Sequence, residues 1–364
     1  MRFLHLADVH LGADPHSGKL KDVNRKEEIW DTFRSTMGTA QKLGVELVLI
    51  AGDLFHYQPS MRDMKEVDYI LSKIYRGKVV IIAGNHDYLR TDGGYSVFDW
   101  NENITVLDKP SEDKPIDKVF FPEWNLEVYG FSYDRKEIKE PLYDNLKPED
   151  NGRIHILLAH GGDENHIPIS REFMAGGAFD YLALGHIHKP GMMSNGGAAF
   201  AGSLEPTDCN DLGKRGCIIC DIEQKNGKIE IHPGFVSMAR RVYIRETIEV
   251  TRNMTNGSLM DLLDSRINDL GKENIYRWTL TGYRDKDIVF NTERIKTLGN
   301  VLEVIDETRP YYNINELLNG HSNDIVGMYI LSFLTGEDGR VKKPEELNEL
   351  EIEALDVGIQ AMLG

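Results

Sequence analysis

The chain has 364 residues, of which 41% are hydrophobic and 28% charged, and its formal net charge is −17. This length allows roughly two or three domains, and the composition is that of an ordinary globular protein. The 3 cysteines exclude a disulfide-rich scaffold, and no apolar stretch approaches the ~20 residues of a membrane-spanning helix. Because Met1 leads directly into a strand-like segment without a signal-peptide pattern, we expect a cytoplasmic protein with no membrane partner.

The N-terminal half alternates apolar, strand-like runs with amphipathic helices. Apolar periodicity predicts one helix from Asn24 to Leu43, ended by Gly44, and another from Met61 to Ile74. This alternation predicts a βαβ architecture in which helices cover the faces of the sheet. The predicted buried strands are residues 2–7, 47–51, 79–83, 154–158 and 181–184.

Other features of this part are interpreted as structural. Pro110 to Trp124 and Lys136 to Gly152 are polar and are predicted to be surface loops. Cys217 and Cys220 lie in a strand-like run, where positions three apart point to opposite faces, so the pair is interpreted as structural rather than as a redox or zinc site. The histidines outside the motifs below are interpreted as structural, surface or packing residues: His5, His16, His155, His166, His232 and His321.

The character of the chain changes after Arg241. Strand patterns over residues 242–250, 276–281 and 301–305, with an amphipathic helix over 258–270, predict a small appended α+β domain. Asp324 to Leu334 then forms a helix that is apolar nearly all round and must be buried on several sides. Apolar residues recur at helical spacing from Leu347 to Leu363. These helices either dock on the chain's own domains or form a surface for a partner.

The negative charge is unevenly distributed. Residues 1–240 carry −9, residues 241–311 carry −1 and residues 312–364 carry −7. Two bound divalent cations would add about four positive charges to the first segment. The acidic total therefore does not exclude a phosphodiester substrate, but it argues against the strong basic footprint of many nucleic-acid-binding proteins.

Five polar motifs each follow a predicted buried strand. Since such sheets keep their sites at the carboxyl ends of the strands, we expect the motifs to meet there. Residues i and i+2 of an extended segment face the same way, so Asp8 and His10 can reach one metal, and His186 and His188 a common cleft. Oxygen and nitrogen ligands suit Mn²⁺ or Fe²⁺, with Zn²⁺ as an alternative, and two such cations ~3.5–4 Å apart catalyse phosphate-ester hydrolysis. The motifs are Asp8-Val9-His10, Gly52-Asp53-Leu54-Phe55-His56, Gly84-Asn85-His86-Asp87, Ala159-His160-Gly161 and Gly185-His186-Ile187-His188.

With these motifs in this order, the chain resembles the calcineurin-like metallophosphoesterases. More narrowly, it resembles the SbcD-type nucleases, the bacterial counterparts of the meiotic-recombination nuclease of double-strand-break repair. The resemblance covers almost the whole chain and implies an α/β fold, a four-layer α/β/β/α sandwich with a small α+β capping domain and a helical C-terminal tail. It implies one Mn²⁺ held by Asp8, His10, Asp53 and His188, and a second held by Asp53, Asn85, His160 and His186, with Asp53 as the bridge.

The resemblance also implies roles for three residues beside the metals. His86 matches the residue that stabilises the scissile phosphate or protonates the leaving oxygen, a transfer that suits imidazole because it titrates near neutrality. His56 matches a histidine that supports His86 and helps to orient the DNA end, with a structural role in the turn as the alternative. Asp87 is expected to be a hydrogen-bond partner that orients the site.

The remaining segments take their expected roles from the same resemblance. Residues 1–241 would be the nuclease domain, 242–311 a capping domain that contacts DNA, and 312–364 a tail that binds an SbcC-type coiled-coil ATPase. Segments near 61–74 and 95–100 would form a homodimer, and the protein would associate with the nucleoid. Candidate phosphate contacts, each of which could instead be a solvated charge, are Arg240, Arg241, Arg245, Arg284 and Lys286.

The sequence thus predicts a Mn²⁺-dependent DNA exonuclease and endonuclease, acting 3′ to 5′ on double strands and nicking single strands. Two alternatives stay open. A phosphodiesterase or phosphatase on nucleotides or other small esters would share the metal motifs but leave the cap and the tail unexplained. A DNA-end-binding repair scaffold would use its metal site only secondarily.

Overall fold

The computed structural model describes residues 1–20, 23–111, 115–193, 196–225, 228–336 and 339–363. The chain forms two compact units, residues 1–244 with 273–275, and residues 245–272 with 276–364. The division into three domains at 241 and 311 stays a prediction. Among the residues described, no helix is both long and apolar enough to span a bilayer.

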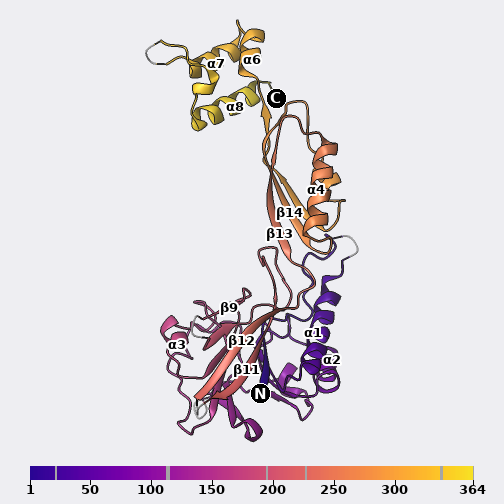
Figure 1. The fold of residues 1–364 in the computed structure, drawn as a ribbon, viewed down its shortest axis with the longest axis vertical. Helices are drawn as coiled ribbons and strands as arrows, with labels where there is room; N and C mark the ends of the chain where they lie inside the picture. Colours follow the sequence, from indigo (N-terminus) through magenta and orange to yellow (C-terminus); the bar gives the residue numbers. More distant parts are fainter. Residues whose placement is uncertain (21–22, 112–114, 194–195, 226–227, 337–338, 364) are drawn as a thin grey trace. The chain divides into compact units, whose positions relative to one another are not determined.

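Two sheets packed face to face form the centre of the first unit (Figure 1). Within the described residues, their strand orders are β12-β11-β1-β2-β3-β4 and β5-β6-β7-β8-β10-β9. Strands β1 to β4 are parallel, and so are β6, β7, β8 and β10. The strands are β1 Arg2–Leu6, β2 Leu47–Ala51, β3 Lys78–Ile82, β4 Ile104–Val106, β5 Asp117–Phe121, β6 Leu126–Gly130, β7 Ile154–His160, β8 Tyr181–Gly185, β9 Gly191–Met192, β10 Ala198–Phe200, β11 Gly216–Lys225 and β12 Lys228–Ser237.

Helices complete the expected four layers. Helix α1 (Arg25–Lys42) and helix α2 (Met61–Tyr69), which continues as a π-helical turn (Ile70–Ile74), pack on the first sheet. Helix α3 (Arg171–Ala175) packs on the second sheet, and Figure 1 shows it on the side of the unit away from α1 and α2. Asn24 caps the start of α1, and Gly44, with φ of +66°, ends it as predicted. The fold is the α/β/β/α sandwich of the metallophosphoesterases.

Two predictions for the intervening loops need correction. Pro110 to Trp124 is not a loop throughout, because 117–121 forms edge strand β5, which pairs with β6, and a 3₁₀ turn (Pro122–Trp124) follows it. Its core face (Val119, Phe121) alternates with exposed residues over too few positions to stand out in the sequence. Residues 112–114 lie outside the described part. Lys136 to Gly152 lacks helices and strands among its residues, yet it buries Tyr143 in the core.

The cysteine pair agrees with the structural interpretation. Cys217 packs in the core between the first sheet and its helices, whereas Cys220 packs between the two sheets. Both thiols are free and buried. Because the two side chains point to opposite faces of β11, they share neither a disulfide nor a metal.

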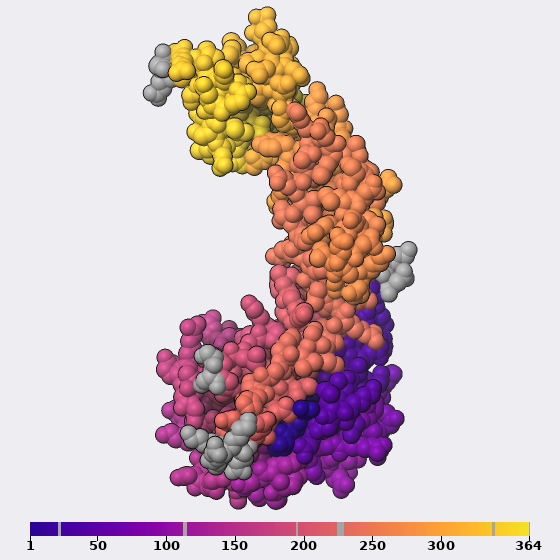
Figure 2. Space-filling view, in the orientation of Figure 1, coloured from indigo at the N-terminus to yellow at the C-terminus, as the bar shows by residue number. Residues whose placement is uncertain are grey.

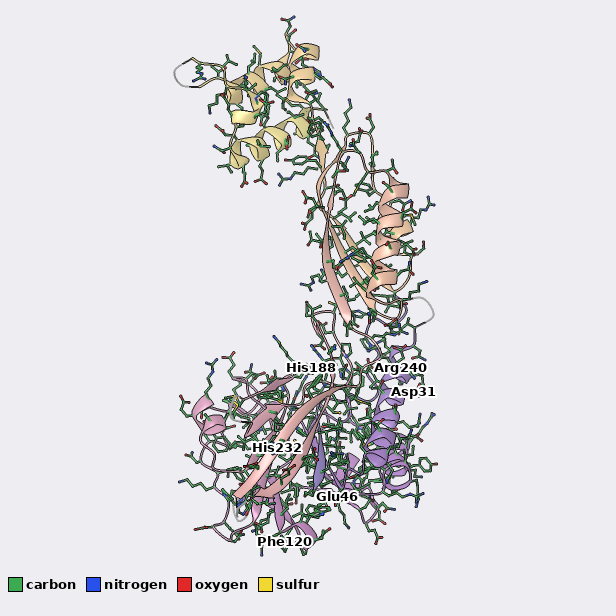
Figure 3. All side chains as sticks on the ribbon, viewed as in Figure 1. Asp31, Glu46, Phe120, His188, His232 and Arg240 are labelled. Carbon is green, nitrogen blue, oxygen red and sulfur yellow. The ribbon has the colours of Figure 1, made fainter. Side chains whose placement is uncertain are left out.

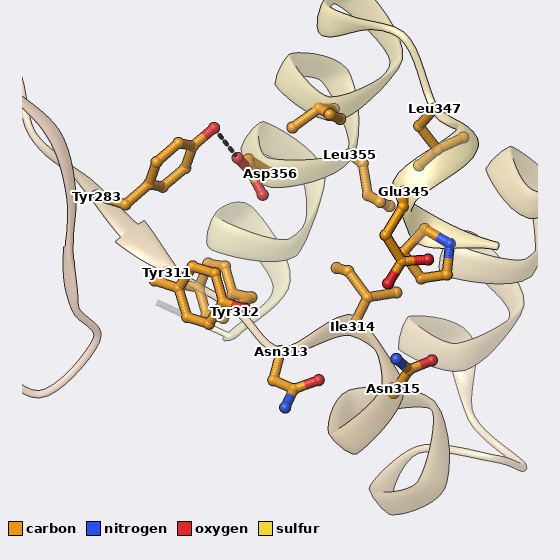
Figure 4. Close-up of a pocket in the computed structure, with 12 residues that line it drawn as sticks. Tyr283, Tyr311, Tyr312, Asn313, Ile314, Asn315, Glu345, Leu347, Leu355 and Asp356 are labelled. Atoms are coloured by element: carbon orange, nitrogen blue, oxygen red, sulfur yellow. Dashed lines mark hydrogen bonds between the residues drawn. The ribbon is translucent and has the colours of Figure 1, made fainter. Parts of the chain in front are cut away.

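The second unit contains a sheet, a covering helix and a cluster of helices. Strands β13 (Tyr243–Val250), β14 (Ile275–Asp285), β15 (Val301–Asp306) and β16 (Arg309–Tyr311) belong to the sheet, beside helices α4 (Asn256–Leu270) and α5 (Thr292–Ile295). Trp278 of β14 and Leu259 and Leu263 of α4 are fully buried. The Tyr283 hydroxyl donates a hydrogen bond of 3.1 Å to Asp356 of the helical cluster, beside a 310 Å³ pocket (Figure 4).

The helical cluster consists of α6 (Ile314–Gly320), α7 (Ile325–Leu334), a 3₁₀ turn (Pro344–Glu346) and α8 (Glu349–Leu363). Figure 2 shows these segments packed together at the yellow end of the chain. Ile330 and Ile359 form the centre of their shared core. Within this chain α7 is buried along one side only, contrary to the expectation of burial on several sides, since Ile325 and Met328 are 72% and 70% exposed.

A buried ion network in the first unit gives a testable prediction. The Arg25 guanidinium, 1% exposed, donates to Glu28 at 2.6 Å and to Glu205 at 2.9 Å. Arg25→Met would leave Glu205 buried without a cation, so we expect the free energy of unfolding in urea to fall by ~3–5 kcal/mol. Arg34→Met, which removes an exposed pair with Glu66, is the control and should cost no more than ~1 kcal/mol. Equal losses in the two variants would contradict this account.

Candidate metal centre

The five motifs lie where the two sheets approach each other at the carboxyl ends of their parallel strands. Two glycines permit this approach. A Cβ at Gly52, where φ is +84°, would lie 2.3 Å from His160 Nδ1, and a Cβ at Gly185 would lie 1.9 Å from the carbonyl oxygen of Ala51. A larger residue at either position would push the sheets apart. The glycines that open the second and fifth motifs therefore bring motifs from different sheets together.

The backbone at the site is turned rather than extended. Asp8, His10, Asp53 and His186 have φ values of +49°, +53°, +50° and +88°. Strand β1 ends at Leu6, after which Asp8 N donates to Gly52 O and His10 N donates to Asp53 O. The expectation that strand alternation aligns Asp8 with His10 is thus wrong, although the two side chains do meet. Each such conformation costs ~1–3 kcal/mol, which the surrounding structure must offset.

The first ligand group contains Asp8, His10 and His188. One donor atom from each lies within 4.8 Å of the others. His10 Nε2 and His188 Nε2 are 3.0 Å apart, and the Asp8 carboxylate accepts the His186 backbone N–H at 3.0 Å. Two imidazole nitrogens and a carboxylate thus converge on one point, as a divalent cation requires.

The second group shares Asp53 with the first. Oδ2 of Asp53 is 3.9 Å from His10 Nε2 and 3.6 Å from His160 Nε2, so one oxygen faces both groups in the position of a bridge. His160 Nε2 contacts Asn85 Oδ1 at 2.9 Å, and its ring centroid lies 5.2 Å from that of His186. The structure therefore brings all seven predicted ligands together, and their ligand roles stay a prediction.

Electrostatics favour cations here. Burial raises the pKa of Asp8 to about 8 and also raises that of Asp53. Burial lowers the pKa of His160 to about 3 and that of His10 well below its usual range, so both are neutral ligands. In the described part of the chain, the ion-pair partners of Asp53 are all imidazoles. The donor set fits two divalent cations, because carboxylates without a fixed cation meet neutral nitrogen donors.

His86 and His56 lie at the rim of this site. The His86 backbone N–H donates to Asp53 Oδ1 at 2.9 Å, and its Nδ1 donates to the His56 carbonyl at 3.0 Å. The two rings stack with centroids 5.0 Å apart, and His56 Nδ1 lies 3.2 Å from His10 Nδ1. The His86 side chain is 34% exposed, whereas that of His10 is 2% exposed. His86 is thus the imidazole of this trio that a substrate reaches.

Asp87 is buried behind the second and third motifs. Its carboxylate accepts hydrogen bonds from Gly84 N at 2.8 Å, Phe55 N at 3.0 Å and the Tyr95 hydroxyl at 2.7 Å. These contacts fix the two turns that carry Asp53 and His86. This geometry supports its expected orienting role.

Sequence reasoning missed several side chains that support the site. Asp163 Oδ2 accepts a 2.7 Å hydrogen bond from His186 Nε2 and also contacts His166, which was interpreted only as a surface or packing residue. Asp211 lies 3.2 Å from His188 Nδ1, and Tyr143 accepts the His160 N–H at 3.1 Å. Asp163 follows His160 closely in the sequence, but neither Asp211 nor Tyr143 belongs to a motif.

The candidate phosphate contacts are dispersed. Arg240 pairs with Asp31 at 3.4 Å, and Figure 3 shows the two labels side by side. Arg241 is largely buried against Glu28 and is engaged within the protein. In the second unit, Arg284 donates to the Ile288 carbonyl, Arg245 is exposed on β13, and Lys286 lines a 420 Å³ cavity. Their contact with DNA stays a prediction.

Comparison with known proteins identifies the family. The calcineurin-like phosphoesterase profile matches residues 1–190. The chain belongs to this family. As a calcineurin-like metallophosphoesterase it is a metal-dependent hydrolase, and its family binds two divalent metals.

Three curated relatives extend this finding. The uncharacterized metallophosphoesterase YhaO of Bacillus subtilis is 25% identical over 75% of this chain and 69% of that protein. The DNA double-strand break repair protein Mre11 of Methanocaldococcus jannaschii is 30% identical over 56% of this chain and 57% of its own length. A component of the nuclease SbcCD of Staphylococcus epidermidis, its SbcD chain, is 24% identical over 77% of this chain and 79% of its own. The match therefore spans little more than half of the Mre11 relative.

Metal binding should stabilise the protein in a pH-dependent way. Because burial raises the pKa of Asp8 to about 8, protons compete with cations for this carboxylate at pH 6 more than at pH 8. We expect saturating Mn²⁺ to raise the unfolding temperature of metal-stripped protein more at pH 8 than at pH 6. Asp53→Asn should lose most of the shift, and Asp31→Asn, at an exposed acid on α1, should retain it. A shift independent of pH, or one that survives Asp53→Asn, would contradict the assignment.

Proposed function

We propose that this metallophosphoesterase is a Mn²⁺-dependent DNA nuclease of double-strand-break repair, a 3′-to-5′ exonuclease on double strands and an endonuclease on single strands. The observation that carries the proposal is the stack of His56 and His86 beside the buried carboxylates. It occurs in a catalytic unit related in sequence to an Mre11 repair protein and to a component of the SbcCD nuclease. A general phosphatase site does not require the second imidazole.

The chain's own groups can perform the proton transfer that cleavage needs. When bound, two divalent ions would activate water and neutralise the phosphoryl oxygens. The His56 carbonyl accepts the proton of His86 Nδ1, which leaves Nε2 directed toward Asp53, 4.0 Å away, at the exposed rim. In the protonated imidazole, Nε2–H can donate to the scissile phosphate or to the leaving oxygen. The stacked His56 ring keeps His86 from turning away.

Replacing His86 should separate proton transfer from metal binding. We expect His86→Ser to reduce Mn²⁺-dependent DNA cleavage at least ~100-fold, because general acid catalysis supplies about that factor or more. The same variant should bind Mn²⁺ with the stoichiometry of the wild type in calorimetry. His232→Ser, at an exposed histidine on β12 that pairs with Glu230, is the matched control. Loss of Mn²⁺ binding in His86→Ser would sink the assigned role.

A substrate panel tests the class of ester. We expect an end-labelled linear duplex to be shortened from its 3′ ends with Mn²⁺, faster than a cyclic dinucleotide or a chromogenic phosphodiester is hydrolysed. Preference for the small esters would instead identify a phosphodiesterase on nucleotides. Full DNA-repair activity in an Asp8→Ala, His86→Ser variant would favour a scaffold.

The helical tail supports a proposed ATPase partner. Ile325, Met328, Leu350 and Val357 are 60% to 75% exposed on α7 and α8, and residues 312–364 carry a net charge of −7. An SbcC-type coiled-coil ATPase would cover this apolar surface. The proposed homodimer would likewise use the exposed apolar residues of α2, such as Tyr69, in a protein associated with the nucleoid.

Charges on the exposed tail face should prevent this association. We expect Met328→Glu with Leu350→Glu to abolish co-purification with an SbcC-type ATPase from the same organism, because both charges would be buried in the contact. The variant should keep its circular dichroism spectrum and its rate on a chromogenic phosphodiester. Undiminished association would show that the partner binds elsewhere or not at all.

A further inference from the structure

The loop after β10 returns to the metal centre and places a carboxylate behind His188. Ser203 N donates to the His188 carbonyl at 3.0 Å, which fixes the start of this loop against the fifth motif. Farther along, the Asp211 side chain is 13% exposed and lies on the Nδ1 side of the His188 ring. No motif contains Asp211, and its place follows only from the fold.

The surroundings of Asp211 are suited to a carboxylate. Its Oδ2 accepts hydrogen bonds from Thr207 N at 2.9 Å, Asp208 N at 3.2 Å and Thr207 Oγ1 at 3.2 Å. His188 Nδ1 is 3.2 Å from the same oxygen and 3.3 Å from Thr207 Oγ1, and an Arg215 guanidinium nitrogen lies 3.6 Å from Oδ1. Donors therefore surround the group on several sides. An acceptor-only side chain satisfies them, whereas an amide would direct its own N–H groups at some of them.

This arrangement determines the state of the His188 ring. Since the Asp211 oxygen can only accept, His188 Nδ1 must carry a proton, and the lone pair is then at Nε2. Nε2 is the atom that faces His10 Nε2 at 3.0 Å within the first ligand group. The carboxylate thus lies behind the ring and the proposed metal in front of it.

We propose that Asp211 is a positioning residue that holds His188 in the tautomer and orientation in which Nε2 binds the metal. This inference rests on the proposed assignment of His188 as a ligand. A carboxylate behind a metal-binding histidine both orients the ring and makes it more basic, and its loss typically costs ~10–100-fold in metal affinity.

Asp163 offers an internal comparison behind His186. Its Oδ2 is 2.7 Å from His186 Nε2, but its side chain is 42% exposed and is shared with His166 at 2.9 Å. Water can replace such an exposed carboxylate, whereas little water reaches Asp211. The two supports therefore differ in strength although both contact a histidine of the same motif.

Calorimetry of metal-stripped protein with Mn²⁺ alone tests the role of Asp211. We expect wild type to bind two Mn²⁺, and Asp211→Asn to weaken one of the two ~10–100-fold. Asp163→Asn should show a smaller loss. Asp208→Asn, at an exposed acid of the same loop whose side chain accepts from Asn210, is the matched control and should bind as wild type does. Wild-type affinity of both sites in Asp211→Asn would overturn the proposal.

A second measurement needs no change at Asp211 and holds even where that variant fails to fold. Nitrogen NMR of histidine-labelled, Mg²⁺-loaded wild type should show His188 protonated at Nδ1, with its signal identified by its absence in His188→Gln. Protonation at Nε2 instead would overturn the proposal. Unchanged metal affinity in His188→Gln would overturn the ligand assignment on which it rests. Protein that binds two ions but leaves DNA intact would refute only the nuclease function.

Discussion

The structure depends on one constraint, the burial of the Asp8 and Asp53 carboxylates among imidazoles. Asp8 is 0% and Asp53 2% exposed, and the ion-pair partners of Asp53 within the described residues are histidines. An ionised carboxylate in such a place is costly unless a cation neutralises it. Its metal-free form must therefore take up protons, which is why burial raises the pKa of both groups. Two divalent cations remove this cost, so metal binding and stability of the site are coupled.

The same demand explains why backbone strain gathers at the site. Four of the predicted ligands have positive φ, and Gly52 and Gly185 let the strands of two sheets come into contact. A single sheet edge would present its side chains in a row, too far apart to surround two ions. The turned backbone after β1 and β2 instead brings Asp8, His10 and Asp53 toward His160 and His188 from the other sheet. The apolar cores on both sides of each sheet hold these turns in place.

The sequence predicts what local pattern controls and misses what only the fold brings together. Apolar runs ending in polar motifs located all the ligand segments, and Gly44 ended α1 as expected. The short edge strand within 117–121 escaped because its alternation covers too few residues, and the alternation argument for Asp8 and His10 failed because β1 stops at Leu6. Asp211 could not be found, because its loop meets His188 through the tertiary structure and carries no recognisable spacing. The pairing of Arg25 with Glu205, 180 residues apart, is hidden for the same reason.

That distant pairing bears directly on the metal centre. Glu205 begins the loop that carries Asp211, and it is held by Arg25, by Thr32 Oγ1 at 2.7 Å and by the Arg240 backbone N–H at 2.7 Å. A shift of this loop would separate buried charges from their partners, at a cost of several kcal/mol, whereas apolar side chains could slide at little cost. Ion pairs therefore fix the loop in one position relative to α1. The His188 ring inherits that position through Asp211, so the geometry at the first ligand group is set partly by charges that never contact a metal.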